Sequence, residues 1–339
     1  MSDTPLPLGK LPPALLARLL ARTPADDPRI LVGPGVGLDC AVVEMGDRLL
    51  VCKSDPVTFV TDALGHYLVQ VNANDLATTG AEPRWLLVTL LLPEGRAAPA
   101  QAESIMAQVG EACRALGVSV VGGHTEVTRG LDHPVAAGTL LGEVARERLV
   151  TPRGARPGDR LLLTKGVPIE GVSILAREFA GRLAEALEPA ELAAARDFLH
   201  SPGISVVRDA RTALAAGTVT AMHDPTEGGV RAALWELAEA SGRRLRVDPA
   251  AIPVPALAGR ICAALGLDPL ATIASGALLL TTPAGDAAAI RAALAAADIP
   301  CAEIGTVEAG PPEVVAQGPE GIAPWPAPPR DEIARLFEG

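Results

Sequence analysis

The sequence is poor in aromatic residues and has no paired cysteines. Phe, Trp and Tyr make up 2% of the 339 residues although 49% are hydrophobic, so a core has to be packed mainly from Ala, Val, Leu and Ile. The five cysteines are scattered, without a CxxC pair. We interpret them as small buried hydrophobes, which fits a reducing cytoplasm.

Membrane and nucleic-acid signals are missing as well. The longest apolar run, residues 85–92, is far too short to span a bilayer. The first residues, MSDTPLPLGK, lack the charged and apolar regions of a signal peptide. A net charge of −11 argues against a nucleic-acid surface, which needs a basic footprint. We therefore expect a cytoplasmic protein with neither a membrane nor a nucleic-acid partner.

Several catalytic signatures are absent from the chain. It contains no GxxxxGK[ST] loop and no GxSxG, and its five histidines show no HxxxH or HExxH spacing. These absences argue against a serine hydrolase and a zinc hydrolase. The glycine-rich stretch ILVGPGVGL, residues 30–38, is open to two interpretations, a phosphate-cradling loop or a flexible turn before a strand.

What the chain does contain is a polar cluster in a predicted helix, VNANDLATTGAEP, residues 71–83. Apolar residues upstream recur at helical spacing, and Gly80 predicts a left-handed stop. Asn72, Asn74 and Asp75 lie inside this helix, before an apolar stretch, Trp85–Leu92, that we expect to form a strand buried on both faces. The polar group either caps nearby backbone or belongs to a metal or phosphate site.

Four further acidic residues occupy similar positions in the predicted order of elements. Each follows a strand or a glycine-rich turn: Asp39, Asp55, Glu126 and Asp224. Converging carboxylates without matching Lys or Arg raise one another's pKa and need a divalent cation. Oxygen ligands suit Mg²⁺. The pattern therefore indicates phosphoryl transfer, in which positioning and charge neutralisation supply most of the rate.

Helical and strand patterns alternate along the chain, which predicts an α/β (α+β) fold with two domains. The turn-forming stretch TPRGARPG, residues 151–158, marks the boundary. We place an N-terminal domain at residues 1–152 and a C-terminal α/β domain at 153–339. The Pro-rich residues 311–330 are expected to form surface coil before a short terminal helix.

The motifs, taken in order, resemble the aminoimidazole ribonucleotide (AIR) synthase superfamily, also called PurM-like. That superfamily includes selenophosphate synthetase, thiamine-monophosphate kinase and the hydrogenase-maturation protein HypE. The DPTEGG turn and the helix after it most resemble the HypE branch. The matching segments span both domains: GVGLDCAVV (35–43), KSDPVTF (53–59), VNANDLATTGAEP (71–83), VGGHTEV (121–127), RPGDRLLLTKG (156–166) and HDPTEGG (223–229).

This resemblance implies N-terminal domains that pair across a homodimer to form a shared β-barrel, with ATP and Mg²⁺ bound by the acidic motifs. It predicts metal ligands at Asp39, Asp55, Asp75 and Asp224. It predicts catalytic roles for Lys53, His124 and Glu126. The residues expected to bind the nucleotide are Gly35, Gly37, Asn72, Asn74, Gly122, Gly123, Thr125, Glu227 and Gly228.

Two positions depart from the HypE pattern. His124 stands where the kinase and HypE branches have Asp, and a neutral imidazole is a poorer Mg²⁺ ligand than a carboxylate. Glu126 could replace it, while His124 could contact phosphate, transfer a proton or only pack. The HypE branch carries a carbamoyl group on a terminal cysteine, but the last cysteine here is Cys301, so we do not expect the carbamoyl-to-cyanide reaction.

We predict a Mg²⁺- and ATP-dependent enzyme that phosphorylates an amide, carboxamide or alcohol oxygen. Its acceptor, a small molecule or a protein-borne group, is unassigned, and kinase, ligase and cyclase types stay open. The alternative is a nucleotide-binding assembly or regulatory protein with little or no turnover. An acidic α/β scaffold without a ligand is a third reading.

Overall fold

The computed structural model describes residue 6, residues 9–58, residue 60 and residues 62–337. Most of the MSDTPLPLGK segment, Phe59 of the KSDPVTF motif and the last two residues lie outside this description. The chain forms two compact units. The N-terminal unit comprises residues 27–33 and 39–149, and the C-terminal unit comprises residues 1–26, 34–38 and 150–339. The predicted division at residue 152 differs from this one, because the first 26 residues and Pro34–Leu38 group with the C-terminal unit.

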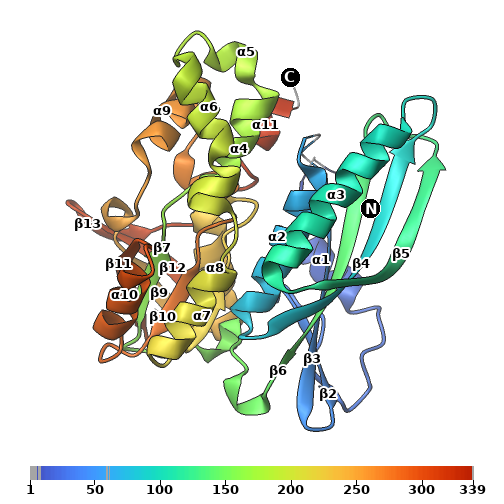
Figure 1. The fold of residues 1–339 in the computed structure, drawn as a ribbon. Helices are drawn as coiled ribbons and strands as arrows, with labels where there is room; N and C mark the ends of the chain where they lie inside the picture. Colours follow the sequence, from blue (N-terminus) through green and yellow to red (C-terminus); the bar gives the residue numbers. More distant parts are fainter. Residues whose placement is uncertain (1–5, 7–8, 59, 61, 338–339) are drawn as a thin grey trace. The chain divides into compact units, whose positions relative to one another are not determined.

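The N-terminal unit is a sheet with two long helices (Figure 1). The sheet has the strand order β1-β2-β3-β6-β4-β5. Neighbouring strands are antiparallel except β4 and β5, which are parallel. In chain order the elements are β1 (Ile30–Val32), β2 (Ala41–Met45), β3 (Arg48–Val57), α2 (Leu64–Thr78), β4 (Glu82–Pro93), α3 (Pro99–Leu116), β5 (Ser119–Thr128) and β6 (Val135–Val144).

Glycine and proline set the ends of the two helices. Beyond α2, Gly80 has a φ of 77°, as its predicted role as a left-handed stop requires. Helix α3 begins with Pro99 and ends at Gly117, whose φ is 72°. Helix α2 packs on β3, β6 and β4, and α3 packs on α2 and β5. Both helices therefore lie on one face of the sheet.

Strand β4 is buried on one face only, so the prediction that Trp85–Leu92 is covered on both faces was wrong. Leu86, Val88 and Leu90 are buried, whereas Leu87 and Thr89 are exposed. The alternation arises because α2 and α3 cover a single face, while antiparallel neighbours such as β6 allow the other face to stay open. An unbroken apolar run does not distinguish these cases.

Strand β5 is longer than the predicted Val118–Val121 and absorbs the glycine pair and the polar residues after it. The turn predicted at Gly122–Glu126 is therefore wrong. Gly123 has a φ of 146°, and a Cβ there would lie 1.9 Å from the carbonyl oxygen of Val88. Glycine is needed at this position because the backbone of β4 approaches closely, not because the chain turns.

The C-terminal unit is built on a second sheet, with the strand order β13-β12-β9-β11-β7-β10-β8. All neighbours are antiparallel except β12 and β9. The elements are α1 (Pro13–Leu20), β7 (Arg160–Thr164), α4 (Ile169–Glu178), α5 (Ala180–Leu183), α6 (Pro189–Asp197), α7 (Val207–Ala216), β8 (Ala221–His223), α8 (Gly229–Ser241), β9 (Arg244–Val247), α9 (Ala256–Leu265), β10 (Leu279–Thr282), α10 (Ala287–Ala296), β11 (Cys301–Glu308), β12 (Glu313–Gly318), β13 (Gly321–Pro324) and α11 (Ala334–Phe337). Single helical turns lie at Arg146–Arg148, Pro152–Gly154, Leu199–Gly203, Pro249–Ala251 and Pro269–Ala271.

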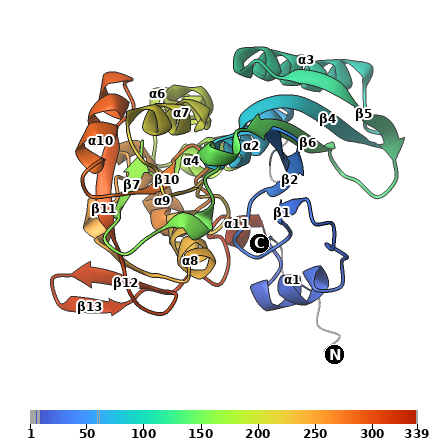
Figure 2. The ribbon, with the colours of Figure 1, turned by 90° about the horizontal axis from the view of Figure 1, so that it is seen from below.

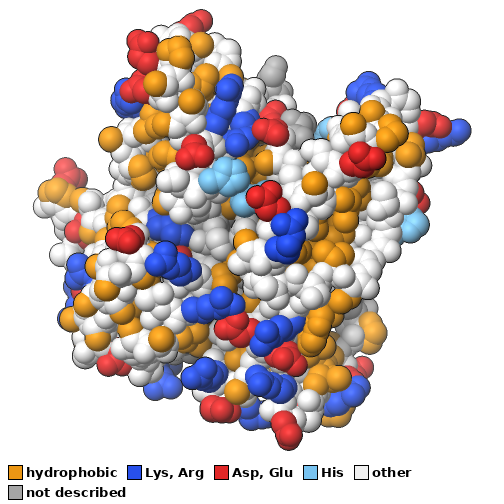
Figure 3. All heavy atoms as spheres, viewed as in Figure 1, with side chains coloured by type: hydrophobic (Ala, Val, Ile, Leu, Met, Phe, Trp, Pro, Cys, Tyr) orange, Lys and Arg blue, Asp and Glu red, His pale blue; other side chains and the backbone are white. Residues whose placement is uncertain are grey.

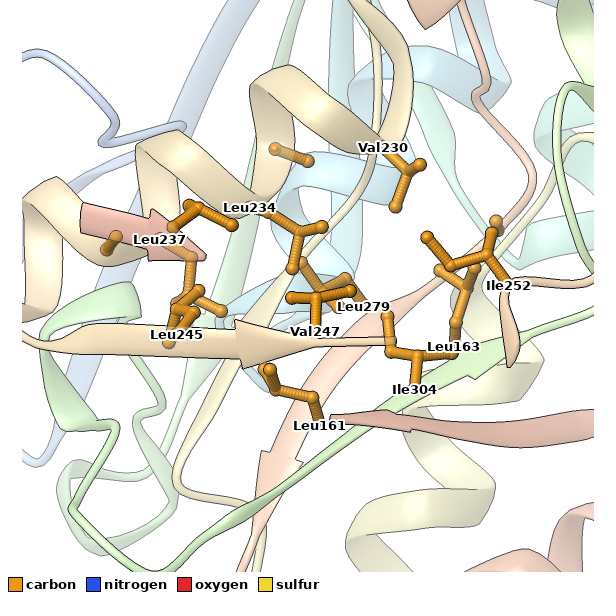
Figure 4. Packing of buried hydrophobic residues seen from close by; sticks show 14 of the residues in the cluster. Leu161, Leu163, Val230, Leu234, Leu237, Leu245, Val247, Ile252, Leu279 and Ile304 are labelled. Carbon is orange, nitrogen blue, oxygen red and sulfur yellow. The ribbon is translucent and has the colours of Figure 1, made fainter. Parts of the chain in front are cut away.

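Helix α8 packs its apolar side on this sheet. Val230, Leu234 and Leu237 of the helix meet aliphatic residues from β7, β9, β10 and β11 (Figure 4). Fully burying a Val or Leu side chain stabilises the fold by about 1.5–3 kcal/mol. The packing fixes α8, and with it the HDPTEGG loop that leads from β8 into its first turn.

The predicted coil at residues 311–330 was partly wrong. Strands β12 and β13 form a hairpin at the edge of the sheet (Figure 2). Val314 and Val315 are buried, although Pro and Gly dominate the flanking sequence. Within the described part of the chain, no helix has both the length and the apolar character needed to cross a bilayer.

Candidate functional sites

Three of the predicted site residues in the N-terminal unit meet at one ion-pair cluster. The Lys53 Nζ atom lies 2.8 Å from Asp75 Oδ2 and 3.1 Å from Asp55 Oδ2. Lys53 and Asp55 are on β3, and Asp75 is in the last turn of α2. The packing of α2 over β3 therefore brings together residues that are about twenty positions apart.

Electrostatic attraction keeps Lys53 charged in spite of its burial. Burial alone would lower the pKa of its ammonium group. The carboxylates of Asp75, Asp55 and Asp39 outweigh that effect and hold the pKa well above its ordinary value. The sequence analysis expected carboxylates without a matching cation; instead, Lys53 is that cation. Asp39 belongs to the same electrostatic group.

Asn72 fixes the backbone of Asp55. Its Oδ1 accepts a hydrogen bond from the Asp55 N–H at 3.1 Å, and its Nδ2 donates to the carbonyl oxygens of Leu68 at 2.9 Å and Asp55 at 3.4 Å. A Cβ on Gly138 of β6 would come within 2.9 Å of Nδ2, so the strand leaves room for this side chain. Both ends of the Asn72 carboxamide therefore hold backbone, which is the capping alternative. Asn74 is fully buried in the same helix.

His124 and Glu126 lie on the opposite face of the sheet from Lys53. Their ring Nε2 and carboxylate Oε2 are 2.9 Å apart. In the register, His124 pairs with Thr89, and paired residues point to the same side of a sheet. Thr89 is on the exposed face, whereas Lys53 is aligned through Leu140 with the buried Leu86 on the helical face. The N-terminal unit by itself thus does not bring the two groups together.

The other predicted residues of β5 follow from the same register. Gly122 pairs with Leu87 on the open face, Gly123 with Val88, and Thr125 with Leu90. Their predicted contact with a nucleotide stays a prediction, as do the catalytic roles of His124 and Glu126.

In the C-terminal unit, Asp224 follows β8 and is completely buried. The preceding His223 is also buried, and its Nδ1 lies 3.0 Å from the Asp224 carbonyl oxygen. Its Nε2 lies 3.0 Å from Glu236 Oε2 on α8. The loop that carries the predicted metal ligand Asp224 is therefore held by a buried histidine that the sequence analysis did not single out.

Residues from far earlier in the chain also contact this loop. Lys10 donates its backbone N–H to Glu227 Oε2 at 2.9 Å and its ammonium group to Thr226 Oγ1 at 3.1 Å. Gly37, one of the predicted phosphate-binding glycines, has a φ of 73°, and a Cβ there would lie 3.1 Å from the Glu236 carbonyl oxygen. Gly35 is in the same segment. The glycine-rich segment thus packs on α8.

A second acidic group surrounds the first turn of α8. Asp331 Oδ2 accepts a hydrogen bond from the Gly228 N–H at 2.5 Å, and Oδ1 accepts from the Ile333 N–H at 2.8 Å. Burial raises the pKa of Asp331 to about 7 despite these bonds, and burial likewise raises that of Glu170 to about 7. Glu227 contributes to both shifts. The Gly228 N–H, predicted to face a nucleotide, is bound by this carboxylate.

The residues that sequence reasoning missed are Lys10, Glu170, His223, Glu236 and Asp331. Glu236 stands seven residues after Gly229, two turns along the same helix, so helical spacing could have placed it beside the loop. No local signal points to Lys10 or Asp331, because their contacts join segments 217 and 103 residues apart.

Comparison with known proteins matches both units to one family. Residues 37–144 match the N-terminal domain of the AIR synthase related proteins, and residues 156–317 match their C-terminal domain. A relative, the carbamoyl dehydratase HypE of Rhodobacter capsulatus, is 32% identical over 265 residues, which cover 76% of this chain and 74% of that protein.

Solved structures agree with these matches. The crystal structure of the hydrogenase maturation protein HypE in complex with ATP has a TM-score of 0.72 and 25% sequence identity, covering 94% of this chain and 96% of that one. AaThiL complexed with AMPPCP and TMP has a TM-score of 0.67 at 24% identity, covering 84% of this chain and 88% of that chain. At this level of identity, the second match shows a common fold.

Proposed function

As a member of the AIR synthase related protein family, to which this chain belongs, the protein is an ATP-dependent enzyme, and we propose that it phosphorylates an amide, carboxamide or alcohol oxygen of its acceptor. The observation that carries the proposal is the Lys53–Asp55–Asp75 cluster. A charged lysine next to carboxylates can orient a phosphate while the acids hold its counter-ion.

The residues of the cluster fit Mg²⁺ by their chemistry. Asp39, Asp55 and Asp75 offer the oxygen donors that Mg²⁺ prefers, together with waters and phosphate oxygens. Bound there, the ion would neutralise charge on the transferring phosphoryl group. Lys53 now balances two of these carboxylates at contact distance. Asp224 is proposed as a further metal ligand, on the C-terminal unit.

Asn72 has a supporting role in this proposal. By holding the N–H and carbonyl of Asp55, its carboxamide fixes where that carboxylate stands. A displacement of about 1 Å in such a group can cost a hundredfold in rate. We assign Asn74 to the same helical turn without a separate role.

The cysteines do not favour a thiol-borne intermediate in this chain. Burial raises the pKa of Cys113 to about 11 and those of Cys262 and Cys301 to about 12, and it also raises the pKa of Cys52. Thiols of this kind stay protonated at neutral pH and react poorly. The acceptor is therefore a separate small molecule or a group on another protein.

Calorimetry of ATP binding, with and without Mg²⁺, tests the proposal. In the wild type we expect micromolar binding that depends on Mg²⁺. Asp75→Asn should weaken it at least tenfold, because the variant removes a charge that both Lys53 and the metal need. Asp47→Asn, in the exposed β2–β3 turn, is the matched control and should bind as the wild type does. If Asp75→Asn retains both Mg²⁺-dependent binding and turnover, the proposal is wrong.

An assembly role is the second candidate, supported by the apolar surface of the N-terminal unit. Hydrophobic side chains gather over the region of α3, β4 and β5 (Figure 3). Exposed residues there include Leu87, Met106, Val120, Val121 and Val127. We propose that this surface pairs two copies in a homodimer, with β5 as an edge strand. Tight ATP binding without phosphate release across amide and alcohol acceptors would favour the assembly role over the enzyme.

A further inference from the structure

A chain of polar contacts links Lys10 to Asp224 within the C-terminal unit. It begins at the His223 ring, which is buried between β8 and α8. Because a carbonyl oxygen can only accept, His223 Nδ1 is the donor in its 3.0 Å contact with the Asp224 carbonyl. This bond fixes the backbone from which the Asp224 carboxylate projects.

The other side of the ring is held by Glu236. His223 Nε2 lies 3.0 Å from Glu236 Oε2, and α8 is anchored by its apolar side to the sheet. Glu236 is therefore a rigid support for the imidazole. Burial would raise the pKa of Glu236, but Lys10 and His223 lower it to about 2. Its carboxylate is charged at neutral pH.

Lys10 completes the chain from a distant segment. Its ammonium group is 3.6 Å from Glu236 Oε1 and 3.1 Å from Thr226 Oγ1, and its N–H binds Glu227. Gly37 packs against the backbone of Glu236 from a third segment. Three segments thus converge on a short loop, HDPTEGG, and each contact constrains either its backbone or its support.

We propose that His223, Glu236 and Lys10 are positioning residues, which hold the Asp224 loop in the geometry that the proposed phosphoryl transfer needs. The inference rests on the proposed function for its catalytic consequence, but the tether itself can be measured separately. Buried polar chains often contribute little net stability compared with apolar residues of similar size. Orientation of a reacting group is a role that they can fill.

The test compares Glu236→Gln with Glu239→Gln, which removes an exposed carboxylate from the same helix. Hydrogen–deuterium exchange of residues 223–229 reports the tether without any ligand. Calorimetric titration of ATP binding with Mg²⁺ reports its consequence. In Glu236→Gln we expect about tenfold faster exchange in the loop and at least a fivefold higher Mg²⁺ requirement. Glu239→Gln should match the wild type in both.

Lys10 provides an independent variant on the far side of Glu236. Lys10→Met should change both measurements in the same direction, and Lys10→Arg should restore at least half of the loss because it retains the charge. Thermal unfolding of each variant separates a loosened loop from a global loss of fold. A role limited to stability would lower the unfolding temperature without changing the Mg²⁺ requirement.

The outcomes separate this inference from the proposed function. If Glu236→Gln behaves as Glu239→Gln in both measurements, the positioning role is wrong while the proposed function stands. If the wild type shows no Mg²⁺-dependent ATP binding, the proposed function fails and the catalytic part of the inference fails with it. Faster exchange in Glu236→Gln would then support only the tether, and unchanged exchange would overturn that too.

Discussion

Two buried lysines, one in each unit, show how differently the same ion pair can be used. Lys53 contacts the carboxylates of Asp55 and Asp75. Lys165 contacts one carboxylate, Asp209 Oδ2 at 3.1 Å, and two backbone carbonyls, those of Ser205 at 2.6 Å and Gly276 at 2.9 Å. The chain has only three lysines against 26 arginines, and Lys10, the third, contacts the Asp224 loop.

The surroundings decide what each lysine can do. Burial lowers the pKa of Lys165, and Asp209 only partly opposes that effect. The same burial is outweighed at Lys53 by three carboxylates. The three donors of Lys165 are matched by three fixed acceptors, so it pins the loop after β7 to neighbouring segments. Lys53 instead faces acids that a metal ion or a phosphate could share. An ion pair is therefore a candidate for function when its acids outnumber its cation.

Replacing Lys165 should give the largest loss of stability. Lys165→Met leaves Asp209 and two carbonyls without their donor in the interior, and we expect a loss of about 3–5 kcal/mol. Urea unfolding measures it. Because Asp209→Asn removes the other side of the pair, the double variant should lose less than the sum of the two single ones. Additive losses would mean that the two side chains act independently, and the comparison would lose its structural half.

Replacing Lys53 should cost less stability but more activity. Lys53→Met leaves Asp55 and Asp75 facing each other, and about 2–3 kcal/mol of stability should be lost. Added Mg²⁺ should restore part of this loss, since the ion can replace the missing positive charge, whereas ATP turnover should fall at least a hundredfold. Hydrogen exchange of β3 and α2, with and without Mg²⁺, measures the first effect. Equal stabilisation of wild type and variant by Mg²⁺ would contradict it.

The acids around the first turn of α8 extend the comparison to carboxyls whose pKa is raised. The pKa of Glu170 in the folded protein is about 7, above its usual 4.5, because of burial. Its contribution to stability is then fully present below about pH 4.5 and is lost as the pH rises through 7. Glu170→Gln should flatten this dependence and stabilise the protein at pH 8 by about 2 kcal/mol.

Thermal unfolding of wild type and Glu170→Gln between pH 5 and pH 8 checks this smallest effect. The exposed Glu185→Gln serves as the control and should retain the slope of the wild type. A wild-type curve that is flat over this range, or a variant with an unchanged slope, would mean that Glu170 does not titrate near neutrality. The contrast between compensated and uncompensated acids would then be weaker than the geometry implies.

Much of the fold was predictable because local patterns determined it. Pro99–Leu116 and Val135–Val144 were predicted with the observed bounds, since their capping residues and periodicity are strong. The hairpin β2–β3 followed from its Gly46-Asp47 turn, although β3 continues further to Val57. The two-domain class follows from the order of the motifs, and the family comparison confirms it.

The failures share one physical cause, which is that tertiary contacts decide them. Whether Leu87 is covered depends on what lies on the far side of the sheet, and an apolar run cannot say. Gly122 and Gly123 look like a turn, yet the need for close backbone approach to Val88 places them in a strand. Residues 313–324 form a hairpin because β9 offers Glu313–Ala316 a parallel partner, despite the flanking prolines.

The candidate site was predictable in its residue types but not in its grouping. Lys53, Asp55 and Asp75 were singled out by motif, and the structure adds that they contact one another. His124 and Glu126 were singled out in the same way but lie on the other face of the sheet. The side on which a strand residue points depends on register, and the Leu86/Leu87 irregularity in the β4–β5 pairing cannot be deduced from spacing.

The loop that carries Asp224 imposes an order on folding. Its partner Lys10 is synthesised more than two hundred residues before Glu227, and Asp331, which binds Gly228, comes about one hundred residues later. Contacts of such long sequence separation close large loops and form late. On the ribosome, the β7–β11 core can assemble while this loop is still incomplete. Residues 223–229 should therefore be the last part of the C-terminal unit to become protected, so binding competence would lag behind compaction.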